Sequence, residues 1–227
     1  MQIIFQDPFS SLNPRFTVED TLREPLRISK QYSRGDLDKQ VTRLMDMVGI
    51  ARRLRMAYPH EMDGGRRQRV GIARAIALEP EFIVCDEPVS ALDVSVRSQI
   101  IRLLLDLQEK RDLSYLFISH DMAVVRYMAN RVGVMYLGHL AEEAPTDELF
   151  THPLHPYTQV LLSAVPTPDP KTHRERIVLD GELPSPLSPP SGCPFHTRCP
   201  LATEKCRMVF PETKQAAEGH FVACHLV

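Results

Sequence analysis

The sequence predicts an α/β fold, in which strands and helices alternate around a parallel sheet. Two short apolar runs, Phe82–Cys85 and Leu116–Ile118, have the composition of buried strands. A long stretch with apolar residues at helical spacing separates them, and such a crossover is typical of neighbouring parallel strands. With 227 residues, 43% of them apolar, the chain can also bury a substantial core.

The N-terminal part is expected to contribute one strand and two helices. Residues 1–5 form a short apolar run, which would be an edge strand if the chain began there. A helix from Asp36 to Val48 is predicted, beginning near Ser33 and ending at Gly49. Its apolar stripe consists of Leu37, Val41, Leu44, Met45 and Val48. A second helix is expected from Gly64 to Leu78.

The middle of the chain is expected to be an α/β layer with parallel strands. After the strand at Phe82–Cys85, the inner face of a long helix is formed by Val96, Ile100, Leu103, Leu104 and Leu107. The strand at Leu116–Ile118, a helix at Met122–Met128 and a strand at Val132–Tyr136 complete the layer.

Proline dominates the C-terminal part. Twelve of the nineteen prolines lie after Phe150, so we expect irregular structure from about Pro166 onward, with an extended linker at Leu183–Pro190. Before that point, Pro156 suits the first turn of a helix. Its inward residues would be Tyr157, Val160 and Leu161.

Charge and hydropathy restrict the function. A net charge of -2, from 27 basic and 29 acidic residues, gives no basic surface for a phosphate backbone, so nucleic acid is not an expected partner. No apolar run approaches the ~20 residues needed to span a bilayer, and the N-terminus does not resemble a signal peptide. We therefore expect a cytoplasmic protein, which can still dock on a membrane protein.

Two carboxylates follow the strand at Phe82–Cys85 directly, as Asp86 and Glu87. Two solvated acids that cap a strand would give the same pattern. In P-loop nucleotide hydrolases, however, an aspartate in this place holds magnesium and a neighbouring carboxylate positions or deprotonates the attacking water. The context favours the second interpretation, because Ser90–Asp93 follows and His120 lies at the end of the next strand, where it can contact a terminal phosphate.

These residues resemble the nucleotide-binding subunits of ABC transporters over about residues 1–151. The resemblance implies a P-loop ATPase fold with a helical subdomain at about residues 14–78, and binding of ATP and Mg²⁺. It assigns Asp86 as the Walker B aspartate, Glu87 as the catalytic glutamate, His120 as the switch histidine, Gln6 as the Q-loop glutamine and Asp93 to the D-loop. The agreement in order and spacing makes a chance match improbable.

The family's signature sequence, usually SGGQ, has a counterpart in Asp63-Gly64-Gly65-Arg66. This element presents a helix N-terminus to the γ-phosphate of a nucleotide on the partner subunit. Asp63 can still cap the helix, but like charges ~4 Å apart repel by about 4 kcal/mol at an effective dielectric constant of 20. Arg66 and Arg67 offset part of that repulsion. We hypothesise that the composite site is weak or asymmetric.

The phosphate-binding loop, G-x-x-x-x-G-K followed by Ser or Thr, does not occur in the sequence. Without its amides and lysine, Asp86 and Glu87 have little nucleotide to act on. In the family this loop lies upstream of the Q-loop. We therefore expect a chain truncated at its N-terminus or started at an internal methionine, and whether it hydrolyses ATP stays open.

The run from His152 to Thr158 resembles the C-terminal extension of oligopeptide and dipeptide importer ATPases. We expect this extension to occupy residues 152–227, after a partial nucleotide-binding domain at 1–151. It contains four cysteines, Cys193, Cys199, Cys206 and Cys224, which make a complete tetrahedral set of thiolates. In a reducing compartment such a cluster suggests a metal rather than disulfides.

The spacing of the cysteines does not choose between zinc and an iron–sulfur cluster. His196, His220 and His225 could substitute as ligands. The resemblance to the peptide-importer extension, carried by Cys193–Pro200, implies a [4Fe-4S] cluster, with Zn²⁺ as the alternative. A metal would supply stabilisation that the proline-rich tail lacks. Cys85, in an apolar strand, is expected to be a small core residue.

The expected function is that of the ATP-binding and ATP-hydrolysing subunit of a bacterial ABC importer for peptides or a similar small solute. Its partners would be a second ABC ATPase subunit in a head-to-tail dimer and integral membrane permease subunits, at the cytoplasmic face of the inner membrane. One alternative is a non-catalytic module limited to dimerisation, permease docking and metal-cluster binding. Another is a soluble ABC ATPase of DNA maintenance or translation, which the neutral charge and the extension disfavour. The solute itself stays open, since nickel, glutathione or sugars would suit the family as well.

Overall fold

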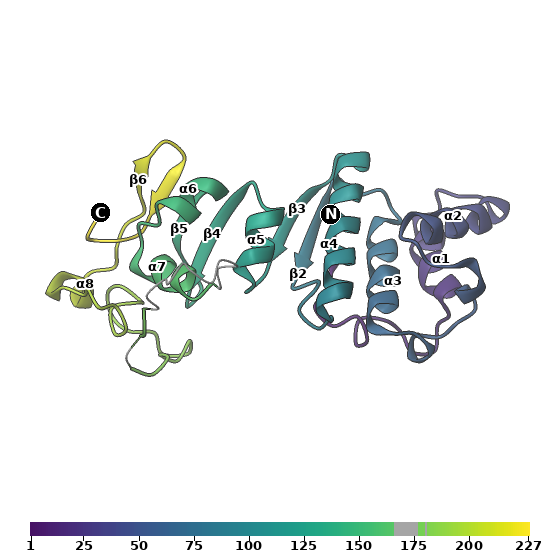
Figure 1. Cartoon of the computed structure of the whole chain (residues 1–227). Coiled ribbons are helices and arrows are strands. Elements are labelled where there is room, and N and C mark those ends of the chain that lie inside the picture. Colours follow the sequence, from purple (N-terminus) through teal and green to yellow (C-terminus); the bar gives the residue numbers. More distant parts are fainter. Residues whose placement is uncertain (166–176, 180) are drawn as a thin grey trace. The chain divides into compact units, whose positions relative to one another are not determined.

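The chain folds into two compact units, Met1–His120 and Asp121–Val227, in the computed structural model (Figure 1). The structure describes residues 1–165, 177–179 and 181–227. The predicted boundary between residues 151 and 152 falls inside the second unit.

The first unit contains a three-stranded parallel sheet in the order β1-β2-β3. Its strands are β1 (Gln2–Ile4), β2 (Phe82–Asp86) and β3 (Ser114–Ile118). Ile4 lies opposite Cys85, and Cys85 opposite Phe117. The predicted N-terminal edge strand and the two strands of the α/β layer are therefore confirmed, together with their parallel direction.

Helices form most of the rest of this unit. They are α1 (Val18–Ser29), α2 (Arg34–Met47), the 3₁₀ turns η1 (Arg52–Leu54) and η2 (Pro59–Glu61), α3 (Gly64–Ile76) and α4 (Val94–Arg111). The three helices predicted from periodicity are confirmed, with ends shifted by a few residues. Helix α1 was not predicted; it starts with a capping box, in which Thr17 and Asp20 satisfy each other's backbone N–H groups.

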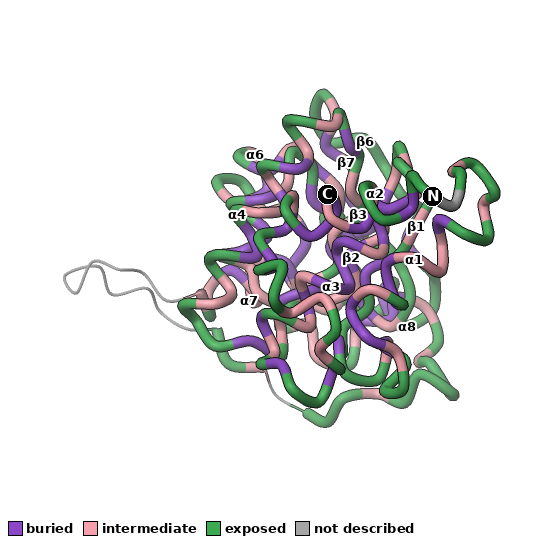
Figure 2. The backbone as a smooth tube through the Cα atoms, turned by 90° about the vertical axis from the view of Figure 1, so that its right-hand side faces the viewer, coloured by how far each residue is buried: buried purple, intermediate pink, exposed green. Residues whose placement is uncertain are grey.

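One face of the parallel sheet is buried and the other is exposed. Ile4, Ile83 and Cys85 are fully buried, and Figure 2 shows the buried residues running through β2 and α3. Tyr115 on the same side donates a hydrogen bond from its hydroxyl to the Leu104 carbonyl of α4, at 3.0 Å. The opposite face presents apolar side chains to solvent, namely Ile3, Leu116 and Ile118. Parallel sheets are normally covered on both faces, so this exposed face is unusual.

The second unit is built on a four-stranded antiparallel sheet in the order β4-β5-β7-β6. Its elements are α5 (Met122–Met128), β4 (Arg131–Tyr136), β5 (His139–Pro145), α6 (Thr146–Thr151), α7 (Pro156–Ser163), α8 (Glu204–Met208), β6 (Lys214–Ala217) and β7 (His220–Val222). Helices α5 and α7 agree with the prediction, including Pro156 in the first turn.

The prediction that the strand at residues 132–136 joins a parallel layer is wrong. Strand β4 pairs with β5 in an antiparallel hairpin. The two-residue turn between them explains the difference, because Leu137 and Gly138 both have positive φ, at 46° and 79°. Such turns match the twist of antiparallel strands and reverse the chain at once.

The prediction of irregular structure from Pro166 onward is also wrong in part. Residues 166–176 and 180 lie outside the described residues, and Leu183–Pro190 contains no helix or strand. Farther on, however, α8 and the β6–β7 hairpin are regular. The hairpin forms because Gly219, with φ 68°, permits a tight reversal, and because β7 finds a partner in β5. Within the described residues, no helix has the length and apolar character required to cross a bilayer.

Candidate functional site

Glu87 lies where the chain leaves the central strand β2. It has positive φ, at 42°, which is uncommon for a residue with a side chain. Its backbone N–H donates to the Ile118 carbonyl at 3.0 Å, and its carbonyl accepts from the Ser90 backbone and hydroxyl at 3.2 and 3.0 Å. This sharp turn holds the Glu87 side chain at the carboxyl edge of the sheet, and local strain of this kind is frequent at functional sites.

Two other predicted site residues converge on the Glu87 carboxylate. The Gln6 amide donates from Nε2 to Oε2 at 3.0 Å, and His120 Nδ1 lies 3.1 Å from Oε1. Gln6 follows β1, Glu87 follows β2 and His120 follows β3 shortly after its end. The carboxyl ends of parallel strands meet at one edge of the sheet, so three segments far apart in sequence form one cluster.

This cluster combines groups suited to proton transfer. The Glu87 side chain is largely shielded from solvent while the His120 ring is mostly exposed. A carboxylate of this kind can accept a proton from water, and an imidazole beside it can donate to an anionic oxygen. Asp86, the last residue of β2, is half-buried and directly precedes the cluster. Together they place a possible magnesium ligand next to a possible general base.

The counterpart of the signature sequence begins helix α3. Asp63 is the N-cap residue, and its Oδ1 accepts the Arg66 backbone N–H at 2.8 Å, as predicted for a capping role. The Arg66 guanidinium also lies 3.4 Å from Asp63 Oδ2. The two residues that depart from the family's usual sequence therefore pair with each other.

The two glycines of this segment have a packing role. A Cβ atom on Gly65 would lie 2.5 Å from Val96 Cγ1, and one on Gly64 would lie 3.3 Å from Leu92 Cδ2. Helix α3 thus begins in close contact with the start of α4, beside Asp93, which is exposed at the N-cap position of α4. The structure groups the predicted residues around Glu87 and around the start of α3.

The four C-terminal cysteines lie in the second unit, where Cys193, Cys199 and Cys206 belong to one apolar cluster. Cys193, Cys206 and Cys224 are buried and Cys199 is half-buried, and the Cys193 backbone N–H donates to the Cys206 carbonyl at 2.8 Å. Burial raises the pKa of the Cys193, Cys199 and Cys224 thiols, and the neighbouring cysteines add to the shift. The donor set suits a thiophilic metal. In the part of the chain that the structure describes, however, no three Cys, His, Asp or Glu side chains come close enough to hold a metal ion.

Cys85 is a core residue, as predicted. It is completely buried in β2, and burial raises the pKa of its thiol to about 12. The His152–Thr158 segment starts helix α7, where His155 Nδ1 accepts the Tyr157 backbone N–H at 3.0 Å. Burial lowers the pKa of His155, which favours the neutral ring that can accept this bond.

Sequence reasoning missed a buried polar pair in the second unit, formed by Glu142 and His220. Glu142 lies in the run Glu142-Glu143, which reads as a solvated edge of a strand. No local pattern distinguishes its buried carboxylate from the partly exposed carboxylate of Glu143 beside it.

Comparison with known proteins agrees with this geometry. The family model described as "ABC transporter" matches residues 1–90, and the one described as "Oligopeptide/dipeptide transporter, C-terminal region" matches residues 141–206. The oligopeptide transport ATP-binding protein AppF of Bacillus subtilis is 54% identical over 228 residues, covering all of this chain and 69% of the relative. The probable peptide ABC transporter ATP-binding protein y4tS of Sinorhizobium fredii is 50% identical and 64% covered.

Solved structures show the same fold. The ATP-binding cassette MJ0796, in a dimeric post-hydrolysis state with ADP and Pi, superposes with a TM-score of 0.56 at 28% identity, covering 64% of this chain and 63% of that one. The structure of cbiO1 from Clostridium perfringens, part of an ABC transporter complex, gives a TM-score of 0.59 at 26% identity, with 66% and 59% covered.

The fold and the strand-end cluster define an ABC-type P-loop ATPase. More narrowly, the chain belongs to the family of oligopeptide and dipeptide ABC transporter ATP-binding proteins, and it spans about 70% of the length of the Bacillus subtilis relatives AppF and YkfD.

Proposed function

We propose that this chain serves as the ATP-binding and ATP-hydrolysing subunit of an ABC importer that energises uptake of peptides or a similar small solute. The observation that carries the proposal is the convergence of Gln6 and His120 on the two oxygens of Glu87 at the carboxyl edge of the sheet. The names of its relatives, which describe peptide and oligopeptide transport, support the choice of solute.

The cluster suggests a division of roles during hydrolysis. Glu87 would orient and deprotonate the attacking water, Asp86 and Gln6 would organise Mg²⁺, and His120 would contact the γ-phosphate. Mg²⁺, when bound, neutralises charge on the phosphates. In the present arrangement both Glu87 oxygens are engaged, so Gln6 or His120 would have to release one of them to admit water.

The start of α3 would act on a nucleotide held by a second ABC ATPase subunit in a head-to-tail dimer. The dimeric state of MJ0796 supports this arrangement. Gly64 and Gly65 bring the helix start close to α4, while Asp63 and Arg66 are exposed beside each other. Permease subunits at the cytoplasmic face of the inner membrane would complete the assembly, with this chain bound peripherally.

Replacing Asp63 by Ser, with Arg66 retained, is expected to raise ATP turnover of a dimer of the upstream-extended chain severalfold. The change removes a carboxylate from the place where a γ-phosphate would approach, and a repulsion of 1.4 kcal/mol corresponds to a factor of about ten. The double variant Asp63→Ser with Arg66→Gln restores the family's usual sequence. Comparing it with Asp63→Ser alone separates the effect of the Asp63 carboxylate from that of the Arg66 guanidinium. If Asp63→Ser leaves turnover unchanged, Asp63 does not weaken the composite site.

The experiment that tests the function is Mg²⁺-dependent ATP binding and turnover by the purified chain, compared with a version extended upstream by a segment carrying G-x-x-x-x-G-K-S. The exposed sheet face offers a surface on which such a segment could pack. ATP binding and hydrolysis by the extended form but not by the short chain would support the proposed function as an importer ATPase. Tight ATP binding by the short chain would contradict the role given to the missing loop.

A second candidate function is a non-catalytic module that retains dimerisation, permease docking and metal binding. The observation that favours it is the altered signature segment, in which Asp63 and Arg66 replace the family's usual Ser and Gln and lie 3.4 Å apart. It predicts that the extended form also fails to turn over ATP, while the chain still associates with a partner ATPase subunit. The same binding and turnover measurement therefore separates the two functions.

We further propose that Cys193, Cys199, Cys206 and Cys224 hold a [4Fe-4S] cluster, with Zn²⁺ as the alternative. The location of all four cysteines in the second unit supports this proposal. To bind one cluster together, the loops that carry the cysteines would have to move closer to one another. Iron and acid-labile sulfide in equal amounts in anaerobically purified protein would identify the cluster. Zinc in place of iron and sulfide would contradict the [4Fe-4S] cluster and favour the alternative. The absence of any bound metal would contradict both.

A further inference from the structure

The second unit contains a carboxylate that is completely buried. Glu142 on β5 has no exposed side-chain surface, and His220 on β7 has almost none. Glu142 accepts three hydrogen bonds, from the Leu154 backbone N–H at 2.7 Å, the His155 backbone N–H at 3.0 Å and His220 Nε2 at 2.7 Å. A charge is tolerated in the interior only when it is satisfied in this way.

These bonds join three segments that are distant in sequence. They link β5 to the start of α7 and to β7, which lies 78 residues farther along the chain. The backbone pairing of β7 with β5 is short: Glu142 lies opposite Val222, Glu143 lies opposite Phe221, and the Ala223 N–H donates to the Ala141 carbonyl at 2.8 Å. A ladder this short gives limited stability alone, so the side-chain pair matters for docking.

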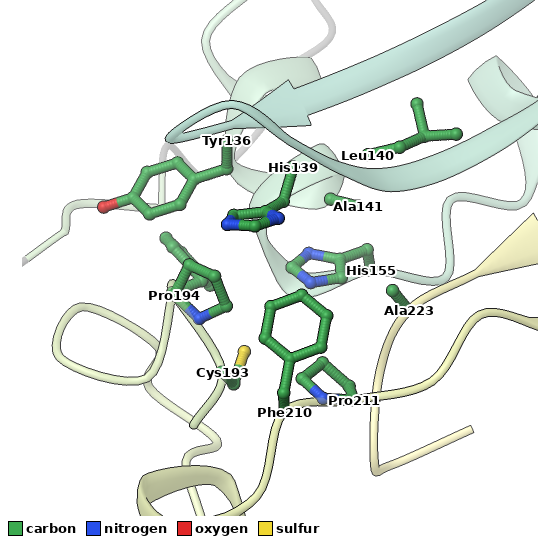
Figure 3. A pocket seen from close by; sticks show the side chains of 11 residues that line it. Tyr136, His139, Leu140, Ala141, His155, Cys193, Pro194, Phe210, Pro211 and Ala223 are labelled. Atoms are coloured by element: carbon green, nitrogen blue, oxygen red, sulfur yellow. The ribbon is translucent and has the colours of Figure 1, made fainter. Parts of the chain in front are cut away.

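A small hollow lies next to this junction. It offers about 20 Å³ of space accessible to water and is lined on one side by Ala141 and Ala223. Figure 3 shows that Phe210, His155 and the Cys193 thiol also face it. The hollow has room for about one water molecule, so apolar contacts around it also contribute to the docking of β7 on β5.

We propose that the Glu142–His220 pair is a latch that docks β7 on β5 and thereby fixes the position of Cys224 relative to the other three cysteines. Cys224 follows the end of β7 by two residues, so its position depends on how β7 is held. Glu142 and His220 are positioning residues in this proposal. It draws on the proposed function only in taking Cys224 as a metal ligand, and the latch itself requires no metal.

Other charged groups around the latch have weaker connections to it. Glu148 Oε1 lies 3.7 Å from His220 Nδ1, and its side chain is partly exposed. Arg131 pairs with the partly exposed Glu143 at 2.8 Å and donates to the Gly219 carbonyl at 3.0 Å. Glu143 neighbours Glu142 on the same strand but lacks its burial, which makes it a matched control.

The test measures how fast each cysteine of the reduced, metal-free full chain reacts with N-ethylmaleimide, resolved by mass spectrometry. His220→Leu removes a donor to a buried carboxylate and is expected to speed labelling of Cys224 by roughly 100-fold relative to wild type. His220→Gln keeps an N–H donor and should restore most of the protection. Glu143→Gln should change labelling by less than about threefold.

The result depends on which cysteines react faster with N-ethylmaleimide in the His220→Leu variant. The latch predicts faster labelling of Cys224 with much smaller changes at Cys193 and Cys206, and none at Cys85 in the other unit. Unchanged labelling of Cys224, or an equal rise at Cys193, Cys206 and Cys224, would overturn it. If His220→Leu does not fold, a His220→Gln variant that labels Cys224 as fast as the unfolded chain would also overturn it.

Metal analysis of the wild-type protein is a separate measurement. Failure of the metal proposal would leave the labelling result intact, and failure of the latch would leave metal binding untouched. The two proposals can therefore be judged independently.

Discussion

Substitution of Glu87 by Gln is expected to lower ATP turnover of the upstream-extended chain by about 100- to 10,000-fold. Gln keeps the size and one acceptor oxygen of the side chain but cannot take a proton from water. The positive φ of Glu87 and its bond to the Ile118 carbonyl keep the side chain at the sheet edge, so the variant should retain its geometry. ATP binding, measured separately, is expected to change little.

The matched control is Glu109→Gln, which removes a carboxylate from the exposed surface of α4. Its turnover should remain within twofold of the parent, since surface substitutions away from special features have small effects. Turnover in Glu87→Gln equal to that of the control would show that another group activates the water.

Substitution of Gly192 by Ala is expected to destabilise the second unit by roughly 3 kcal/mol. Gly192 has φ of 67°, and an added Cβ would lie 2.5 Å from the Cys206 carbonyl oxygen and 2.8 Å from the Arg207 carbonyl. Backbone atoms cannot move aside as a side-chain end can. Denaturant unfolding followed by cysteine labelling would measure the loss of stability. If the proposed cluster is present, the variant should also bind less of it, because the clash lies at Cys206.

Gly138→Ala provides the control for backbone conformation alone. Gly138 also has positive φ, at 79°, but no atom lies within 4 Å of an added Cβ. A cost of about 1 kcal/mol is expected there. Equal losses of stability in the two variants would mean that the crowding at Cys206 has no effect.

The cluster around Glu87 could be predicted because its parts follow one simple rule. Gln6, Glu87 and His120 each come just after an apolar strand-like run, and parallel strands bring such ends together. The pairing of Asp63 with Arg66 was harder to predict from the sequence. The sequence shows that both depart from the family's usual residues, but only the helix geometry places them within 3.4 Å.

Helix α1 was missed because Pro25 interrupts its pattern, and proline inside a helix normally breaks it. The signal that could have revealed it is Thr17 followed three residues later by Asp20, which forms the capping box in the structure. The hairpin of β4 and β5 was missed because Leu137 gives no turn signal, although Gly138 beside it does.

The sequence by itself determined the local features of this protein: where most helices and strands begin and end, which residues follow the parallel strands, and which family the chain resembles. These depend on neighbouring residues, whose spacing can be read directly. Only the tertiary structure decided that β7 joins β5 and that Glu142 is buried against His220 while Glu143 is partly exposed. The physical reason is that burial of a charge depends on a partner 78 residues away, and no local pattern encodes that distance.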